Sequence, residues 1–210
     1  MVSPLSPFSP DRAQSIAHYG EKALLKKVRA WLGDATPPSP AGMGDDCAVL
    51  PLSPAPTRLI TTDSVVLDHH FTSTTPPRLV GRKLIARSLS DIAAMGGTPT
   101  QAVLAGLLPA RTRISWLRDC LRGLAETALA HGVPIVGGDL AESSCDLALN
   151  LTLLGTGNTF LLRNGGSPGD ALGVTGPLGG SLLHERHLSF PPRVGEGRLL
   201  ASLSGVHACI

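Results

Sequence analysis

Three stretches of the chain place apolar residues at helical spacing. They span residues 20–33, 76–95 and 115–131, and an apolar stripe at this period predicts three amphipathic helices. Prolines begin the second stretch, where a first helical turn tolerates them. Ser115 is a suitable cap for the third helix, and glycines at the ends of the first two stretches indicate where those helices stop.

Short apolar runs around these helices predict strands. The runs lie at residues 47–52, 58–62, 65–71, 101–108, 133–136 and 147–155. From the first of them onward, the order is three strands, helix, strand, helix and two strands. This order predicts an α+β fold, a mixed sheet with helices on one face.

Composition divides the chain into three predicted parts. Residues 1–19 contain prolines and serines without periodicity, and we expect a flexible leader there. Residues 20–157 are long enough for a complete domain. From residue 158 onward, a glycine-rich loop, a strand at residues 171–174 and a helix opening at residues 175–180 predict a second α/β domain. We expect that domain to be incomplete, because about fifty residues enclose a core poorly.

Composition and charge exclude several classes of protein. Of the 210 residues, 42% are apolar and 16% charged, which allows a sizeable core and argues against global disorder. Aromatic residues make up 3%, too few for a module that stacks nucleic-acid bases. The net charge of +2 does not indicate a polyanion binder. We therefore expect no nucleic-acid partner.

The cysteines and the hydropathy predict a cytoplasmic protein. The four cysteines, at positions 47, 120, 145 and 209, are far apart and form no Cys-x-x-Cys pair, so reduced thiols are expected. The chain does not begin with a signal-peptide pattern. Its apolar runs are shorter than the roughly 20 residues of a membrane-spanning helix, so no membrane partner is expected.

Four acidic motifs lie beside predicted strands and helices. They are Gly44-Asp45-Asp46, Thr61-Thr62-Asp63, Ser90-Asp91 and Gly137-Gly138-Asp139. Carboxylates are preferred ligands of hard divalent cations, which carry phosphate groups with them, so converging motifs predict a magnesium–nucleotide site without a P-loop. An aspartate after a strand is also often a turn former or helix cap, and this alternative stays open for each motif taken singly.

In order and spacing, five motifs resemble the thiamine-monophosphate kinases, a family of the aminoimidazole-ribonucleotide-synthetase-like superfamily. The motifs are residues 44–50, Thr61-Thr62-Asp63 with His70-Phe71, residues 88–96, residues 136–139, and Arg163-Asn164-Gly165 with Pro168-Gly169-Asp170. The resemblance runs from about Gly20 to Ile210. It implies the N-terminal domain of that superfamily's fold.

The resemblance also implies an activity. Members of this family transfer a phosphoryl group from ATP to thiamine monophosphate with Mg²⁺, giving thiamine diphosphate by direct in-line attack of the acceptor phosphate. They are typically homodimers, in which the first domains pair into a barrel of strands and the nucleotide lies near the shared surface. We therefore expect Mg²⁺, ATP, thiamine monophosphate and a second copy of the chain as ligands and partner.

The resemblance assigns roles to individual residues. It gives magnesium binding to Asp46, Thr61, Thr62, Asp63, Asp91 and Asp139, with Asp45 as an alternative to Asp46. It gives nucleotide contacts to Gly138, Asp139 and Arg163, since glycine allows close approach of the backbone to phosphate and arginine presents a planar fork to it. It gives contact with the thiamine phosphate to His70.

Alternatives remain. The family continues with a second acidic motif after the point where this sequence reaches Ile210, so the chain is expected to be truncated. A non-catalytic nucleotide-binding or dimerisation module of the same fold is therefore the main alternative. Selenophosphate synthetase and aminoimidazole-ribonucleotide synthetase are less similar: residues 1–33 contain no cysteine, and the Asp-Gly-Val-Gly-Thr-Lys phrase is absent.

Overall fold

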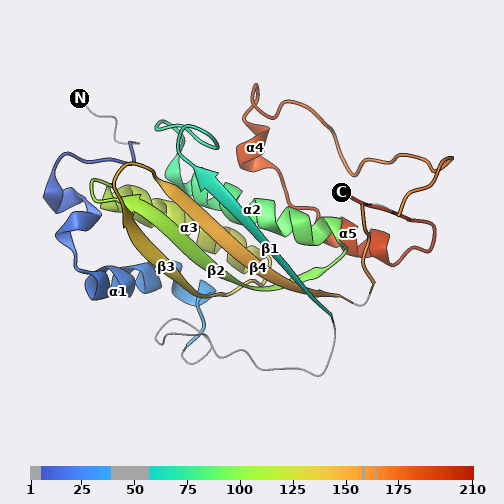
Figure 1. Cartoon of the computed structure of the whole chain (residues 1–210), viewed down its shortest axis with the longest axis horizontal. Helices are drawn as coiled ribbons and strands as arrows, with labels where there is room; N and C mark the ends of the chain where they lie inside the picture. Colours follow the sequence, from blue (N-terminus) through green and yellow to red (C-terminus); the bar gives the residue numbers. More distant parts are fainter. Residues whose placement is uncertain (1–5, 39–56, 158, 164) are drawn as a thin grey trace.

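The computed structural model describes residues 6–38, 57–157, 159–163 and 165–210, and a four-stranded sheet forms its centre (Figure 1). The strands are β1 (Thr57–Val66), β2 (Thr98–Pro109), β3 (Ile135–Ser143) and β4 (Ala148–Gly157), in the order β1-β4-β2-β3. The pairs β1–β4 and β4–β2 are antiparallel, whereas β2–β3 is parallel. The predicted mixed sheet is confirmed.

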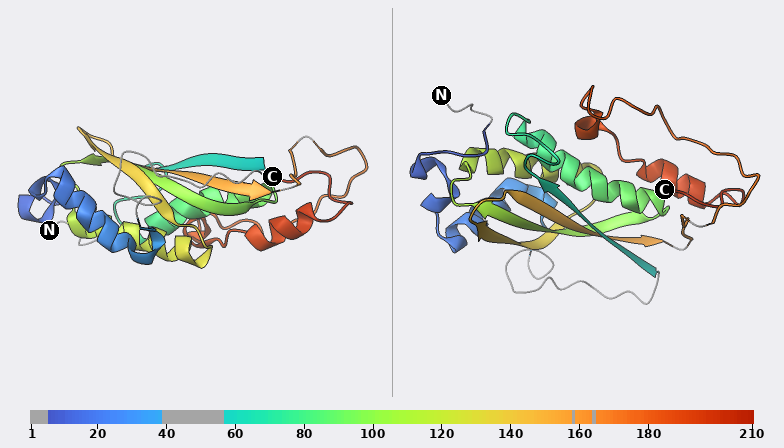
Figure 2. Two further views of the ribbon diagram at one scale, coloured as in Figure 1. Left: turned by 90° about the horizontal axis from the view of Figure 1, so that it is seen from below. Right: turned by 45° about the horizontal axis from the view of Figure 1, so that its top comes forward.

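Two long helices, α2 (Pro77–Ala94) and α3 (Ile114–Ala130), cover one face of this sheet (Figure 2). Their apolar stripes and the inward residues of the strands form the core, in which Leu89 and Leu117 are fully buried. The two helices approach closely at a pair of glycines. An added Cβ at Gly81 would lie 1.9 Å from the Cys120 carbonyl oxygen, and one at Gly123 would lie 2.0 Å from that of Arg78.

Shorter helices flank this layer. Helix α1 (Glu21–Leu32) packs near α3 and ends at Gly33, whose φ of 53° is readily adopted by glycine. Helices α4 (Arg186–Ser189) and α5 (Val194–Ala201) pack against α2. These three shorter helices thus flank the two long ones. Within the described residues, no helix is long and apolar enough to cross a membrane.

The three predicted helices are confirmed, but several details of the other elements were wrong. Residues 65–71 do not form a separate strand: Val65 and Val66 finish β1, and a turn follows between the bridged Leu67 and Phe71. Helix α3 is preceded by Arg113 as its N-cap, so Ser115 lies inside the helix. The predicted strand at residues 47–52 lies outside the described residues.

The segment expected to be a flexible leader makes specific contacts from residue 6 onward. The Arg113 guanidinium donates to the carbonyl oxygens of Ser6 and Phe8, each at 3.1 Å. The backbone N–H of Ser9 donates to the Arg111 carbonyl at 2.9 Å, and Ser9 is buried. These contacts join residues about a hundred positions apart, so local composition does not reveal them.

The C-terminal segment also differs from its predicted elements. Residues 171–174 form no strand, and Leu172 is 97% exposed. Beyond this extended stretch the chain returns to α2 through α4 and α5 (Figure 1). The apolar run at residues 171–174 was read as a strand from its composition, but a strand needs a neighbour to pair with. The division into domains stays a prediction.

Candidate functional site

Strand β1 presents its acidic motif to two sides of the sheet. Side chains on a strand alternate between faces, so Thr61 and Asp63 face helix α2, whereas Thr62 and Ser64 face the opposite side. The Thr62 hydroxyl accepts a hydrogen bond from the Thr152 hydroxyl of β4 at 3.2 Å. Thr62 therefore lies apart from the two residues that flank it in the sequence.

The carboxylate of Asp63 is held by two neighbouring residues of α2. Its Oδ1 accepts from Nε and a terminal nitrogen of Arg87 at 3.0 and 2.9 Å, and its Oδ2 accepts from the Ser88 hydroxyl at 3.2 Å. The third guanidinium nitrogen donates to the Ser64 carbonyl at 3.1 Å. Asp63 lies in the middle of β1 rather than at the strand end predicted from the sequence.

Asp91 lies beside this ion pair, two helical turns along α2 from Lys83. One of its carboxylate oxygens, Oδ2, accepts from the Thr61 hydroxyl at 2.6 Å, and Asp91 is exposed. The structure therefore brings together three of the predicted site residues: Thr61, Asp63 and Asp91.

The pKa of Asp63 responds to its burial and to two neighbouring charges. Burial is the main cause that raises the pKa of Asp63; the Arg87 cation lowers it, and the Asp91 charge raises it. Carboxylate and hydroxyl oxygens are the donors that a hard cation such as Mg²⁺ prefers, so the chemistry of Thr61, Asp63 and Asp91 fits this ion. Among the described residues, no group of three or more His, Cys, Asp or Glu side chains is arranged to hold a metal.

Asp139 lies on the other face and at the other edge of the sheet. It is exposed in the middle of β3, in register with Ala105, Asn150 and Ser64. Three strand spacings separate β3 from β1, which is roughly 14 Å. The structure therefore does not bring Asp139 to the pair of carboxylates on β1 and α2 within one chain.

Gly138 has a packing role that the sequence did not reveal. An added Cβ there would lie 1.9 Å from the Leu104 carbonyl oxygen, so only glycine allows β2 and β3 to approach at this point. Gly138 is exposed on its other side. Close approach of a ligand to this backbone is compatible with the packing role.

A group of basic side chains lies next to the ion pair. The buried Lys83 ammonium donates to the His70 carbonyl oxygen and contacts Nδ1 of His187 at 2.8 Å. The ring nitrogen Nδ1 of His70 accepts from the Val66 N–H at 3.2 Å. The pKa of His70 is lowered by burial first and then by the charges of Arg87 and Lys83. Burial likewise lowers the pKa of Lys83 and of His187.

Sequence reasoning assigned a role to Asp91 but none to Lys83 or Arg87, which lie on the same face of α2. The three residues stand at positions i, i+4 and i+8 of α2, a spacing that places side chains on one face of a helix. This spacing was the available signal. His187 comes from a segment more than a hundred residues away, and the sequence carried no signal for its position.

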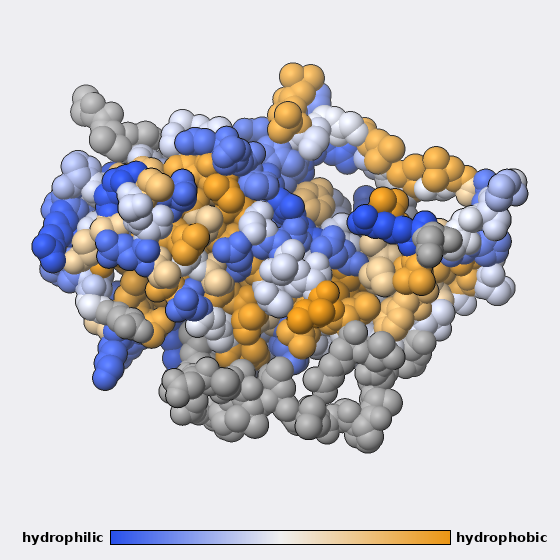
Figure 3. All heavy atoms as spheres, in the orientation of Figure 1, coloured by the Kyte–Doolittle hydropathy of each residue, from blue (hydrophilic) through white to orange (hydrophobic). Residues whose placement is uncertain are grey.

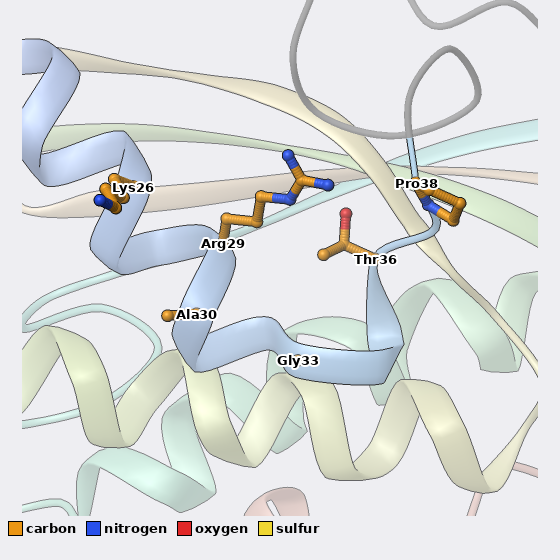
Figure 4. Close-up of a pocket in the computed structure, with 6 residues that line it drawn as sticks. All are labelled: Lys26, Arg29, Ala30, Gly33, Thr36 and Pro38. Carbon is orange, nitrogen blue, oxygen red and sulfur yellow. The ribbon is translucent and has the colours of Figure 1, made fainter.

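The remaining predicted residues lie elsewhere. Arg163 is exposed and follows the bridge between Leu162 and Ala208. Asp45 and Asp46 lie outside the described residues. A shallow pocket at the end of α1 contains none of the predicted site residues (Figure 4); it is lined by Lys26, Arg29, Ala30, Gly33, Thr36 and Pro38.

Comparison with protein families places these elements in a known domain. Residues 44–157 match the family "AIR synthase related protein, N-terminal domain". The matched range contains all four strands, both long helices and the acidic motifs of β1, α2 and β3. It is more than half of the 210 residues.

Individual proteins are similar over a longer range. A thiamine-monophosphate kinase of Rhodopirellula baltica is 38% identical over 177 residues, which are 80% of this chain and 56% of the relative. The solved thiamine-monophosphate kinase of Stenotrophomonas maltophilia is 26% identical, with a TM-score of 0.67 over 90% of this chain and 66% of that one.

A second solved structure, AaThiL complexed with AMPPCP and TMP, has a TM-score of 0.65 over 90% of this chain and 64% of that one. Its identity of 23% shows a common fold. The chain spans about half the length of the curated relatives it matches.

Proposed function

The chain belongs to the AIR synthase related proteins through their N-terminal domain at residues 44–157, and from this premise we propose that it takes part in ATP-dependent phosphorylation of thiamine monophosphate to thiamine diphosphate. The curated relatives are thiamine-monophosphate kinases. The structure of AaThiL, which has the same fold, contains AMPPCP and TMP. Both observations support this reaction as the activity to test.

The observation that carries the proposal is the cluster of Thr61, Asp63 and Asp91 within the matched range. Two carboxylates lie close enough for the charge of Asp91 to raise the pKa of Asp63, and a threonine hydroxyl is bonded to the more exposed one. Such a cluster of oxygen donors, with a buried basic residue nearby, suits phosphate groups that arrive with divalent cations.

The reaction requires both oxygen ligands for a divalent cation and basic side chains for phosphate. Donor and acceptor are both phosphates, so their charges repel each other and must be screened before an in-line attack. When bound, Mg²⁺ screens that repulsion and stabilises the spreading negative charge. The chain's own part is to hold the cation through Asp63 and Asp91, while the Thr61 hydroxyl orients the Asp91 carboxylate.

The other predicted contacts complete the proposal. We assign the thiamine phosphate to His70, which lies on the turn after β1 beside the cations of Lys83 and Arg87. We assign nucleotide contacts to Gly138, Asp139 and Arg163. Asp46 and Thr62 remain proposed magnesium ligands, although Thr62 points to the other face of the sheet.

We also propose a homodimer. The sheet face opposite α2 and α3 is not covered by other described elements, and Figure 3 shows that it mixes apolar and polar side chains. Ile60 is 72% exposed and Leu107 is 44% exposed. A second copy packed on this face would cover both residues. It would also bring the Asp139 of one protomer close to the sheet of its partner.

The experiment is chromatographic detection of thiamine diphosphate after the purified chain is incubated with ATP, Mg²⁺ and thiamine monophosphate. Native protein is expected to form product and Asp91→Asn to form none, because this change removes a proposed cation ligand from an exposed position. Glu126→Gln is the matched control, since Glu126 is an exposed carboxylate of α3 paired with Arg78. It should retain native turnover.

The absence of product would contradict catalysis by this chain. Mg²⁺-dependent ATP binding without turnover would then assign it to the alternative class, a non-catalytic nucleotide-binding module. Equal product from native protein and Asp91→Asn would contradict the assignment of the site.

A further inference from the structure

The carboxylate of Asp63 already has a cation of the chain's own bound to it. Two nitrogens of Arg87 donate to Asp63 Oδ1 at 3.0 and 2.9 Å. A third nitrogen donates to the Ser64 carbonyl at 3.1 Å, which fixes the guanidinium across β1. Three hydrogen bonds fix the orientation of the planar guanidinium, so this ion pair has a defined geometry that exposed surface pairs often lack.

The ion pair of Asp63 and Arg87 is largely shielded from water. The side chain of Asp63 is 12% exposed and that of Arg87 is 33% exposed. Burial raises the pKa of Asp63 and the Arg87 charge lowers it, so the guanidinium offsets part of the cost of burying this carboxylate. A buried carboxylate needs a compensating cation, and in this structure Arg87 supplies it.

The neighbouring carboxylate is different. Asp91 is exposed, and its carboxylate accepts a hydrogen bond from the Thr61 hydroxyl at 2.6 Å. The cluster is therefore asymmetric: one carboxylate is open to solvent and the other is neutralised. A divalent cation shared by both would compete with the guanidinium for Asp63 Oδ1. A divalent cation held by Asp63 Oδ2 instead would still lie next to the positive charge of Arg87.

We propose that Arg87 is an intramolecular counter-ion that occupies the position of a divalent cation at Asp63, and that a cation bridges Asp63 and Asp91 only after this guanidinium moves away. The proposal rests on the proposed role of these two carboxylates in metal binding. It makes Arg87 a residue that weakens cation affinity. Removal of its charge is therefore expected to strengthen binding, the opposite of what a ligand or a purely structural residue would show.

The first test is Mn²⁺ binding by the full chain at pH 8 without nucleotide, followed through the electron paramagnetic resonance signal of free Mn²⁺. Arg87→Met is expected to bind Mn²⁺ at least about tenfold more tightly than native protein, because hydrogen bonds to a charged group no longer have to be broken. Arg78→Met is the matched control. Arg78 lies on the same helix and pairs with Glu126 on the surface, so affinity should not change.

Two outcomes separate this proposal from the proposed function. If Asp63→Asn and Asp91→Asn weaken Mn²⁺ binding but Arg87→Met leaves it unchanged or weaker, the metal site stands and the role of Arg87 is wrong. If neither aspartate variant affects Mn²⁺ binding, the metal site itself is wrong, and the proposal for Arg87 is lost with it.

A second measurement uses the native chain, so it does not depend on whether Arg87→Met folds. The Nε–H resonance of Arg87 is followed by ¹H–¹⁵N nuclear magnetic resonance during a Mg²⁺ titration. Release from Asp63 is expected to shift this resonance and speed its exchange with water, while the Arg78 resonance stays in place. An unchanged Arg87 resonance at saturating Mg²⁺ would overturn the proposal.

Discussion

Asp63 and Asp91 are both proposed magnesium ligands, yet they differ in what else they do for the protein. Asp63 accepts hydrogen bonds from the half-buried Arg87 and from Ser88. Asp91 accepts one from the Thr61 hydroxyl and is exposed. Binding and stability should therefore respond differently to the same substitution at the two positions.

Asp63→Asn and Asp91→Asn are each expected to abolish Mg²⁺-dependent ATP binding, measured by isothermal titration calorimetry. Only Asp63→Asn should lower the free energy of unfolding, by about 1–3 kcal/mol, because it leaves a partly buried guanidinium without its ionic partner. Urea unfolding measures this difference. Asp119→Asn, on α3, is the control for binding. Equal losses of stability in the two site variants would contradict the structural role of Asp63.

At this scale the sequence assigned roles to the acidic residues but did not reveal their hydrogen-bond partners. Thr61, Asp63 and Asp91 belong to motifs that are short and local. The contact of Asp63 with Arg87 joins residues 24 positions apart, and it depends on how α2 lies against β1. Gly138 was assigned to phosphate, whereas its contact with the Leu104 carbonyl depends on the pairing of β2 and β3.

Among the elements, helix α4 is joined to α2 through the side chain of Arg82. The Arg82 guanidinium donates to the carbonyl oxygens of Leu188, Ser189 and Phe190 at 2.8–2.9 Å. These carbonyls lie at the C-terminal end of a four-residue helix, where such groups have no partner within the helix. A positive charge at this end is also favourable.

Arg82→Met is expected to release α4 from α2 while the sheet and the long helices stay folded. Amide hydrogen exchange at residues 186–190 should accelerate at least about tenfold, because three charge-assisted hydrogen bonds are lost. Exchange in β4 should remain unchanged. Arg78→Met, one turn earlier on α2, is the control. Unchanged exchange at residues 186–190 would show that other contacts hold α4.

The docking of α4 is also expected to depend on pH. Nδ1 of His187 lies 2.8 Å from the Lys83 ammonium, where a neutral ring nitrogen accepts a hydrogen bond and a protonated one cannot. Burial and then the Lys83 charge lower the pKa of His187 below 6.5. In the window from that lowered pKa up to 6.5, the unfolded chain binds more protons than the folded one, so stability falls as pH decreases.

Thermal unfolding between pH 7.5 and 5.5 measures this effect. The melting temperature of the native chain should decrease toward pH 5.5, and the decrease should be smaller in His187→Gln. His70 and His131, whose pKa values are also lowered mainly by burial, account for the slope that remains. The exposed His18→Gln is the control for loss of an imidazole. A slope that does not change in His187→Gln would contradict the argument.

The period of the apolar residues was sufficient to predict α1, α2 and α3, because the backbone hydrogen bonds of a helix form within its own segment. Strands were harder. β1 was read as two strands, since the polar residues 61–64 interrupt its apolar pattern and the pairing with β4 that holds it together is not local. The contacts of residues 6–19 with the start of α3 are equally non-local.

On the scale of the whole molecule, the chain has one covered and one open sheet face. Helices α2 and α3 cover one side (Figures 1 and 2). The strand registers place Ser64, Asn150, Ala105 and Asp139 in a row on the other side. A sheet with exposed Ile60 and Leu107 on this side has apolar area that a second copy could cover. The four-stranded sheets of two protomers would then face each other.

A substitution in the middle of the open face tests this arrangement. Native protein is expected to sediment at twice the 21.7 kDa chain mass, and Ala105→Arg to sediment as a monomer, because a charged side chain would be buried between the sheets. Ala130→Arg is the matched control, since Ala130 is exposed on α3 in the other layer. Analytical ultracentrifugation distinguishes the two masses. A native monomer would contradict the proposed dimer. A dimer that survives Ala105→Arg would place its interface elsewhere. The nucleotide contacts assigned to Asp139 would then have to form within a single chain, about three strands away from Asp63.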